Sequence, residues 1–134
     1  MTKKKTIKTD KKEIQDFWGA LYGSLYGKID KHITPEYLET GLTNLEKMFE
    51  YRSHMAVTEI VLDQLSGKKL LEIGSGAGAH SALFAKYGAS VTSLDITFER
   101  AQSTQNKFSV LNKTKLGCQA IQGDAENLPF PEKS

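Results

Sequence analysis

The chain has 134 residues, 39% of them hydrophobic and 25% charged, which is typical of one globular domain with a single core. No apolar run approaches the length that crosses a bilayer, and the N-terminal lysines are not followed by the apolar segment of a secretory signal. The single cysteine, Cys118, excludes an internal disulfide and favours a cytoplasmic protein.

The net charge of +2 is unevenly distributed along the chain. Residues 1–12 contain six lysines and one aspartate and so carry +5, which leaves −3 for residues 13–134. The lysine-rich segment has neither the arginine nor the aromatic residues that support binding to nucleic acid or membranes, so we expect residues 1–12 to be a disordered, solvating tail. The mildly acidic remainder argues against a nucleic-acid partner.

Residues 13–66 are expected to form a helical segment that caps the rest of the chain or covers it as a lid. Apolar and aromatic side chains recur every three or four residues from Glu13 to Asp30, which predicts a helix. Its aromatic residues fit either a lid over a ligand or an amphipathic helix packed on the domain. The packed helix is the favoured interpretation because aromatic stripes commonly belong to a core.

Two further helical pieces are expected before the chain changes character. Pro35 predicts a helix start, and Gly41 is expected to interrupt that helix. The segment 44–65 has the most regular apolar stripe and predicts a second helix, bent near Ser53 and ended by Gly67.

From residue 67 the pattern changes to short apolar runs that alternate with single helices. Such an alternation is typical of a parallel sheet with right-handed crossovers, in which ligands bind at the carboxyl ends of the strands. The expected elements are strands at 70–73, 90–94 and 119–122 and helices at 79–87 and 99–112.

An acid or a glycine turn follows each of the three expected strands. Glu72 and the turn 74–78 end the first strand, Asp95 ends the second, and Asp124 follows the third. Because the carboxyl ends of parallel strands meet at one edge, these residues predict a single site. The glycine turn suits a nucleotide-like ligand, since glycine lets the backbone approach closely and the following helix start offers free N–H groups.

The glycine turn alone leaves two ligand classes open. Gly74, Gly76 and Ala79 satisfy the dinucleotide fingerprint, and Asp95 follows Gly74 by 21 residues, close to the spacing of a ribose-binding acid. Against a dinucleotide, Glu72 precedes the turn and neither lysine nor arginine lies in it, so a pyrophosphate would be opposed electrostatically. The expected ligand therefore lacks phosphates and can carry positive charge.

Three motifs stand in order between about Lys68 and Ser134. They are Leu-Leu-Glu-Ile-Gly-Ser-Gly-Ala-Gly, Val-Thr-Ser-Leu-Asp-Ile and Gly-Asp-Ala-Glu-Asn-Leu-Pro-Phe. In this combination the chain resembles class I S-adenosylmethionine-dependent methyltransferases, and most closely the broad group of small-molecule methyltransferases that includes quinone-biosynthesis enzymes. The resemblance implies S-adenosyl-L-methionine as cofactor, with a sulfonium and an ammonium but no phosphate, and methyl transfer to a small-molecule acceptor.

The resemblance also implies which residues hold the methionine end of that cofactor. Gly74, Ser75, Gly76 and Gly78 form the turn beneath the methionine moiety, and Glu72 lies near its ammonium group through water or backbone.

The adenosine end is expected at the second and third strands. The resemblance implies that Asp95 accepts hydrogen bonds from both ribose hydroxyls and that Ile96 packs on the adenine. Asp124 then accepts from the adenine amino group, and the Ala125 N–H reaches a ring nitrogen. In the alternative interpretation, Asp95 and Asp124 merely cap the turns that follow them.

The fold implied is α/β and Rossmann-like, with strand order 3-2-1-4-5-7-6. Residues 67–134 match only strands 3-2-1, the N-terminal half of that domain, so we expect a chain truncated after the third strand and an open, aggregation-prone apolar edge at strand one. No residue identifies itself as a catalytic base, and no metal ligand is expected. The competing functions are an NAD(P)-binding oxidoreductase domain and a non-catalytic interaction module.

Overall fold

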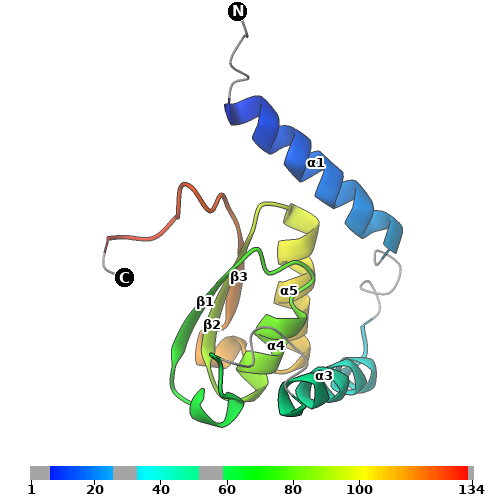
Figure 1. Cartoon of the computed structure of the whole chain (residues 1–134), viewed down its shortest axis with the longest axis vertical. Helices are drawn as coiled ribbons and strands as arrows, with labels where there is room; N and C mark the ends of the chain where they lie inside the picture. The colour runs from blue at the N-terminus through cyan, green and yellow to red at the C-terminus, as the bar shows by residue number, and fades with distance from the viewer. Residues whose placement is uncertain (1–6, 26–32, 52–58, 133–134) are drawn as a thin grey trace, which may run out of the picture.

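A three-stranded parallel sheet forms the centre of the fold (Figure 1). Its strands are β1 (Lys69–Ile73), β2 (Ser90–Asp95) and β3 (Gln119–Gln122), with β2 in the middle. The order counted from β3 is therefore 3-2-1, which confirms the predicted partial Rossmann-like topology. This computed structural model describes residues 7–25, 33–51 and 59–132.

The pairing of the strands brings their carboxyl ends together. Ile73 of β1 pairs with Leu94 of β2, and Asp95 pairs with Gln122 of β3. The glycine turn after β1, the end of β2 and the segment after β3 therefore lie at one edge of the sheet, as the sequence predicted.

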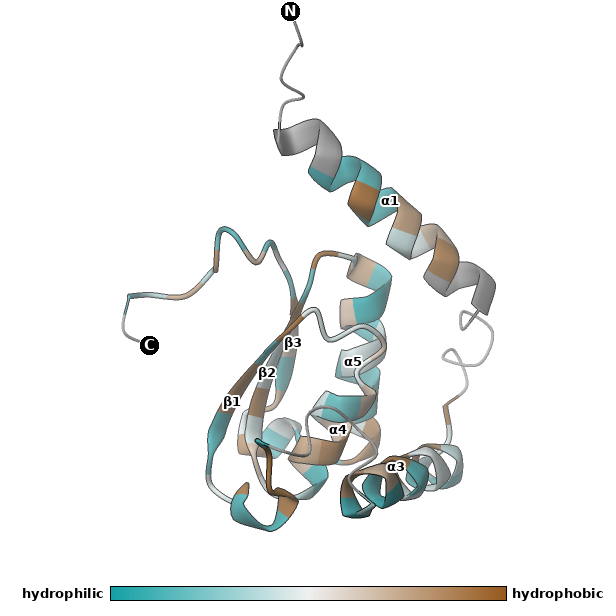
Figure 2. Ribbon diagram, in the orientation of Figure 1, coloured by the Kyte–Doolittle hydropathy of each residue, from teal (hydrophilic) through white to brown (hydrophobic). Residues whose placement is uncertain are grey.

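Two helices cover one face of this sheet. They are α4 (Ala79–Lys86) and α5 (Phe98–Val110), and a short 3-10 turn, η3 (Thr114–Leu116), leads into β3. Between helices and sheet lies the core, which includes the fully buried Phe108 and Val91 and the buried Cys118. Figure 2 shows the apolar residues concentrated on β1 and β2, whereas α5 is largely hydrophilic on its visible side. Helix α5 is thus amphipathic, with its apolar side turned to the sheet.

The other face of the sheet has no helix over it among the described residues. Leu71 and Ile73 of β1 point to that face and are 45% and 50% exposed. Leu94 shares the face but is buried against the segment after β3, since a Cβ on Gly123 would lie only 2.6 Å from Leu94 Cδ1. The apolar edge at β1 is present, and its tendency to aggregate stays a prediction.

The N-terminal helix α1 (Ile7–Leu25) begins earlier than the sequence predicted. Residues 7–12 were assigned to a disordered tail, but they are helical. Lysine is a good helix former, and Lys12 pairs with Asp16 one turn later, with Nζ 3.1 Å from Oδ2. The far end of the expected helix, residues 26–30, lies outside the described residues.

Helix α3 (Pro35–Glu50) starts where Pro35 predicted, and the hydroxyl of Thr34 accepts a hydrogen bond from the Tyr37 N–H at 3.2 Å. The predicted interruption at Gly41 is wrong. Glycine costs a helix about 1 kcal/mol relative to alanine, but Leu38 and Leu42 on either side of it are buried in the core. Tertiary packing therefore carries the helix through the glycine.

The helix predicted over 44–65 is only partly correct. Helix α3 ends at Glu50, and residues 59–65 form an irregular segment with one 3-10 turn, η2 (Leu62–Gln64). The expected bend near Ser53 lies outside the described residues. Leu65 is buried and the partly buried Ile60 and Leu62 pack on the same core, so apolar residues at helical spacing are accommodated here by turns.

Candidate functional site

The turn between β1 and α4 has the backbone geometry that its glycines predicted. Gly74, Gly76 and Gly78 have φ angles of 71°, 58° and 88°, a left-handed region that side chains with a Cβ rarely adopt. Gly78 is the N-cap of α4, so the turn leads directly into a helix N-terminus.

Helix α5 holds this turn through hydrogen bonds to its carbonyl groups. Thr104 Oγ1 donates to the Gly76 carbonyl at 3.3 Å, and Ser103 Oγ donates to the Ala77 carbonyl at 3.4 Å. The approach is so close that a Cβ on Gly78 would lie 2.3 Å from Thr104 Oγ1. This support could not be predicted from the sequence, because Ser103 and Thr104 resemble ordinary polar residues of an amphipathic helix.

Asp95 lies beside the turn and is already hydrogen-bonded. Its carboxylate is buried and accepts from the Gly76 N–H at 3.0 Å and from the Thr97 N–H at 2.9 Å. These are the contacts of the capping interpretation. Since each carboxylate oxygen has two acceptor sites, Asp95 retains the capacity to accept from a ligand hydroxyl at each oxygen.

A cleft of about 480 Å³ opens at this edge of the sheet. It gathers five of the nine predicted site residues from the ends of all three strands. The other four, Glu72, Ser75, Gly76 and Gly78, do not line it. The five residues that line the cleft are Gly74, Asp95, Ile96, Asp124 and Ala125.

Three buried polar atoms near the cleft have no hydrogen-bond partner within the part of the chain that the structure describes. They are Ser75 Oγ, Thr97 Oγ1 and Arg100 Nε. Buried polar atoms are nearly always paired in native proteins. At Gly74, no atom lies within 4 Å of the position that a Cβ would take. Orphaned polar atoms and open space beside a glycine turn fit a site built for a polar ligand.

Glu72 lies under the turn. Ser81 Oγ of α4 donates to Glu72 Oε1 at 2.9 Å, and Ser93 of β2 donates in turn to Ser81. Burial raises the pKa of the Glu72 carboxyl, and the hydrogen bond from Ser81 opposes that shift. The Glu72 side chain therefore lies on the helix-covered face of the sheet, where it is hydrogen-bonded to α4. Its role toward an ammonium group stays a prediction.

The raised pKa of Glu72 predicts a pH dependence of stability. Below its ordinary pKa of 4.5, the carboxyl is protonated both in the folded and in the unfolded chain, so the free energy of unfolding does not change with pH through this group. As pH rises from there through the raised folded value, the unfolded chain releases the proton more easily, so the free energy of unfolding falls. The Glu72→Gln variant keeps the acceptor for Ser81 and should lack this decrease.

Urea unfolding of both proteins across this pH range measures the effect. We expect the stability difference between Glu72→Gln and the original protein to grow in favour of the variant as pH rises. A difference that stays constant with pH would contradict the assigned pKa shift.

Arg100 places a positive charge beside the glycine turn. Its Nη1 lies 3.3 Å from where a Cβ on Gly76 would stand, and its guanidinium lies 4.9 Å from the ring centroid of Trp18. The absence of a cation from the turn's own sequence therefore does not mean its absence in space. Arg100 could therefore offset part of the electrostatic repulsion between Glu72 and a phosphate-bearing ligand.

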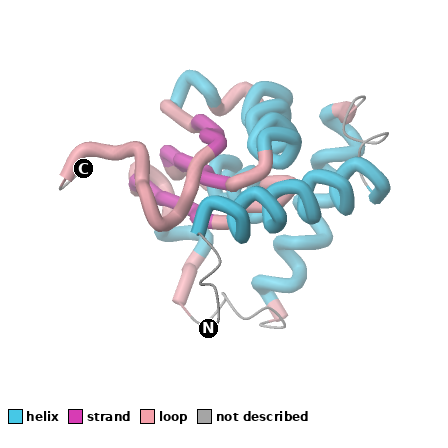
Figure 3. Tube along the Cα trace, turned by 90° about the horizontal axis from the view of Figure 1, so that it is seen from above, coloured by secondary structure: helices cyan, strands magenta, loops and turns pink. Residues whose placement is uncertain are grey.

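Helix α1 lies across the carboxyl edge of the sheet, as Figure 3 shows from above. Lys11, Ile14 and Trp18 line the cleft, and Gln15 Nε2 donates to the Ile96 carbonyl at 2.8 Å. Phe17 is 60% exposed. Trp18, by contrast, packs on Arg100 of α5, so the two described aromatic side chains of α1 differ, and both the packed helix and the lid stay predictions.

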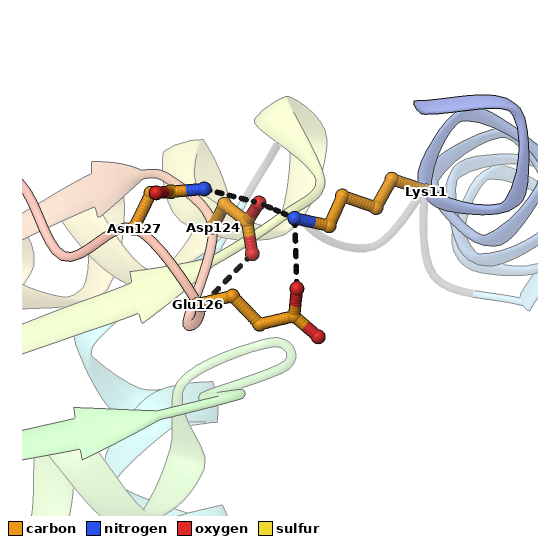
Figure 4. A network of polar contacts seen from close by, with 4 residues as sticks. All are labelled: Lys11, Asp124, Glu126 and Asn127. Atoms are coloured by element: carbon orange, nitrogen blue, oxygen red, sulfur yellow. Dashed lines mark hydrogen bonds and ion pairs between the residues drawn. The ribbon is translucent and has the colours of Figure 1, made fainter. Parts of the chain in front are cut away.

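Asp124 links α1 to the segment after β3 through hydrogen bonds (Figure 4). Its Oδ2 accepts from the Lys11 ammonium and its Oδ1 from the Glu126 N–H at 2.9 Å. Lys11 also pairs with Glu126 Oε2 at 3.0 Å. The hydrogen bond from Lys11, followed by that from the Glu126 N–H, holds the pKa of Asp124 below its ordinary value. The role of Lys11 could not be predicted from local sequence patterns, because 113 residues separate it from Asp124.

Residues 7–25, 33–51 and 59–132 contain neither a candidate membrane span nor a candidate metal centre. None of the helices there is long and apolar enough to cross a membrane. No group of three or more histidine, cysteine or acidic side chains there is arranged to hold a metal ion.

Comparison with known proteins finds similarity to methyltransferases. Residues 71–134 match the family described as "Methyltransferase domain". The chain is similar to phthiotriol/phenolphthiotriol dimycocerosates methyltransferase of Mycobacterium leprae, with 35% identity over 60% of this chain and 28% of that protein. It is also similar to fatty-acid O-methyltransferase of Mycolicibacterium smegmatis, with 25% identity over 69% of this chain and 33% of that protein.

A third similarity, to the biotin biosynthesis bifunctional protein BioHC of Cellvibrio japonicus, has 40% identity over 53% of this chain and 13% of that protein. In each of the three comparisons, the match covers a third or less of the length of the curated relative.

Proposed function

We propose, from the match of residues 71–134 to the methyltransferase-domain family, that the chain provides the cofactor half-site of a class I S-adenosyl-L-methionine-dependent methyltransferase. One observation supports the proposal above all others. The cleft at the carboxyl edge gathers Gly74, Asp95, Ile96, Asp124 and Ala125, each of which the family resemblance had assigned to the cofactor.

The residues at the second and third strand ends suit the adenosine part of this cofactor. Asp95 is held rigidly by two backbone N–H groups and still has acceptor sites for the ribose hydroxyls. Ile96 presents an apolar side chain to the cleft for the adenine, and Asp124 and the Ala125 N–H supply an acceptor and a donor for its edge. The orphaned Ser75 Oγ is a donor for the polar methionine end.

The chemistry requires little of the protein beyond positioning. When bound, S-adenosyl-L-methionine supplies a methyl group already activated by a sulfonium, so no residue of this chain has to generate the electrophile. The cleft residues hold the reacting partners in place, and α1 limits the access of water. No described residue is assigned as a general base.

The methyl acceptor is proposed to be a small molecule. The names of two relatives refer to phthiotriol/phenolphthiotriol dimycocerosates and to a fatty acid. The body of the chain carries a net charge of −3 outside its first twelve residues, which disfavours the phosphate backbone of a nucleic acid. The single, buried cysteine is consistent with a cytoplasmic location.

Thermal unfolding with two ligands tests the proposed function. S-adenosylhomocysteine, the demethylated cofactor, should raise the melting temperature by about 8 °C at a concentration 100 times its Kd, because it binds only the folded chain. NADH should produce no shift. A shift with NADH alone would support an oxidoreductase domain instead, and no shift with either ligand would support the non-catalytic interaction module.

A further inference from the structure

Lys11 occupies the acceptor that a bound adenine would need. Its ammonium donates to Asp124 Oδ2, the oxygen that also lies 3.5 Å from Asn127 Nδ2, while Asp124 Oδ1 is taken by the Glu126 N–H (Figure 4). Oδ2 of Asp124 therefore has both of its acceptor sites engaged within the chain, and Oδ1 has one of its two engaged. An adenine amino group that approaches Asp124 meets a cation of the protein in its place.

Besides Lys11, α1 contacts the cleft region through polar and stacked side chains and through the apolar Ile14. Gln15 donates to the Ile96 carbonyl, and Trp18 stacks on the guanidinium of Arg100. These residues and Lys11 recur at helical spacing and so form one face of α1. The apolar Ile14 and Phe17 remain 48% and 60% exposed. Among the side chains of α1 that the structure describes, residues 11–21, those of Ile14, Phe17 and Trp18 are each at least 40% exposed, and a helix docked in this way is held largely by contacts that can be exchanged for others.

We propose that α1 is a lid over the cofactor cleft and that Lys11 is its latch, which holds the lid closed on Asp124 until the adenine amino group of the ligand takes its place. The proposal rests on the proposed function for the identity of the ligand. The latch is a salt bridge between side chains that are 25% and 28% exposed, so it is weak enough to yield to a ligand.

A latch of this kind lowers the apparent affinity for the ligand. Only the fraction of molecules with an open lid is competent to bind through Asp124, and the apparent Kd is the intrinsic Kd divided by that fraction. Removal of the Lys11 charge raises the open fraction and should therefore strengthen binding. A residue that merely contributed to the wall of the cleft would have the opposite effect on removal.

Calorimetric titration with S-adenosylhomocysteine compares three variants with the original protein. Lys11→Gln removes the latch and should lower the Kd about two- to fivefold, the factor expected from loss of one partly exposed ion pair. Glu126→Gln removes the second partner of Lys11, whose side chain is 71% exposed, and should change the Kd in the same direction but less. Lys12→Gln removes the same charge from the next residue of α1, which pairs with Asp16 outside the cleft, and should leave the Kd unchanged.

A second measurement needs no ligand. Trp18 is the only tryptophan of the chain, so acrylamide quenching of its fluorescence reports on the position of α1. Quenching should increase in Lys11→Gln and stay unchanged in Lys12→Gln.

The outcomes separate the two proposals. If the original protein does not bind S-adenosylhomocysteine, the proposed function fails, and the quenching experiment still decides on the latch. If it binds, but Lys11→Gln binds equally or more weakly, the latch is refuted while the proposed function stands. Equal quenching in Lys11→Gln and Lys12→Gln would also refute the latch.

Discussion

Gly78→Ala is expected to lower the free energy of unfolding by about 3 kcal/mol. Two costs add at this position. The φ angle of 88° lies in the left-handed region, where a residue with a Cβ costs about 1–2 kcal/mol. The new methyl would also meet Thr104 Oγ1 at 2.3 Å and Thr104 Cβ at 2.7 Å, and such overpacking typically costs about 1–3 kcal/mol.

Urea unfolding measures this effect against two matched glycine variants. Gly74→Ala has a φ of 71° but no atom within 4 Å of the added Cβ, so it should lose only the backbone cost of about 1–2 kcal/mol. Gly41→Ala lies in α3, also with no atom within 4 Å, and should gain about 0.5–1 kcal/mol from higher helix propensity. Equal losses at Gly78 and Gly74 would contradict the close contact between the turn and α5.

Asp95→Ala is expected to weaken S-adenosylhomocysteine binding at least about 100-fold, because the ribose hydroxyls lose a charged acceptor on both oxygens. The same substitution leaves the N–H groups of Gly76 and Thr97 without their partner, so it should also destabilise the fold by about 2 kcal/mol.

A destabilised control separates these two effects. Leu42 is 1% exposed and lies in α3, away from the cleft. Leu42→Ala should cost about 2–4 kcal/mol without a change in affinity when binding is measured well below its melting temperature. If Asp95→Ala binds S-adenosylhomocysteine as tightly as Leu42→Ala does, Asp95 is a cap and the ribose assignment is wrong.

The part of the fold predicted best is the alternating half. The strands around Leu70, Val91 and Ile121 and the helices between them lie within two residues of the expected bounds, because short apolar runs and glycine stops determine such elements locally. The second and third strands also end at or within two residues of the acids Asp95 and Asp124, as predicted. Local patterns are reliable here because each strand and helix buries one continuous face against its neighbours.

The N-terminal half was predicted less well because packing outweighs local preference there. Gly41 lies in a continuous helix because Leu38 and Leu42 anchor both sides. The apolar residues of 59–65 have helical spacing but pack on the core from turns. Propensity and periodicity are weak priors where tertiary contacts decide the backbone.

The helical side chains that line the cleft could not be predicted from local sequence patterns. Lys11, Trp18 and Arg100 reach the cleft from two helices, and their contacts join residues that are far apart in the sequence. A lysine in a basic segment indicates solvation by default, and only the docking of α1 turns that lysine toward Asp124.

The cofactor is proposed to bind at the carboxyl edge of the sheet. Amide chemical shifts measured by NMR during titration with S-adenosylhomocysteine test this binding site most directly. We predict that the largest shifts fall on Gly74, Ser75, Ile96 and Ala125, and that the amides of α3 stay in place. Shifts centred instead on the separate cleft beside Glu46 and Tyr87, or no shifts at saturating ligand, would contradict the account.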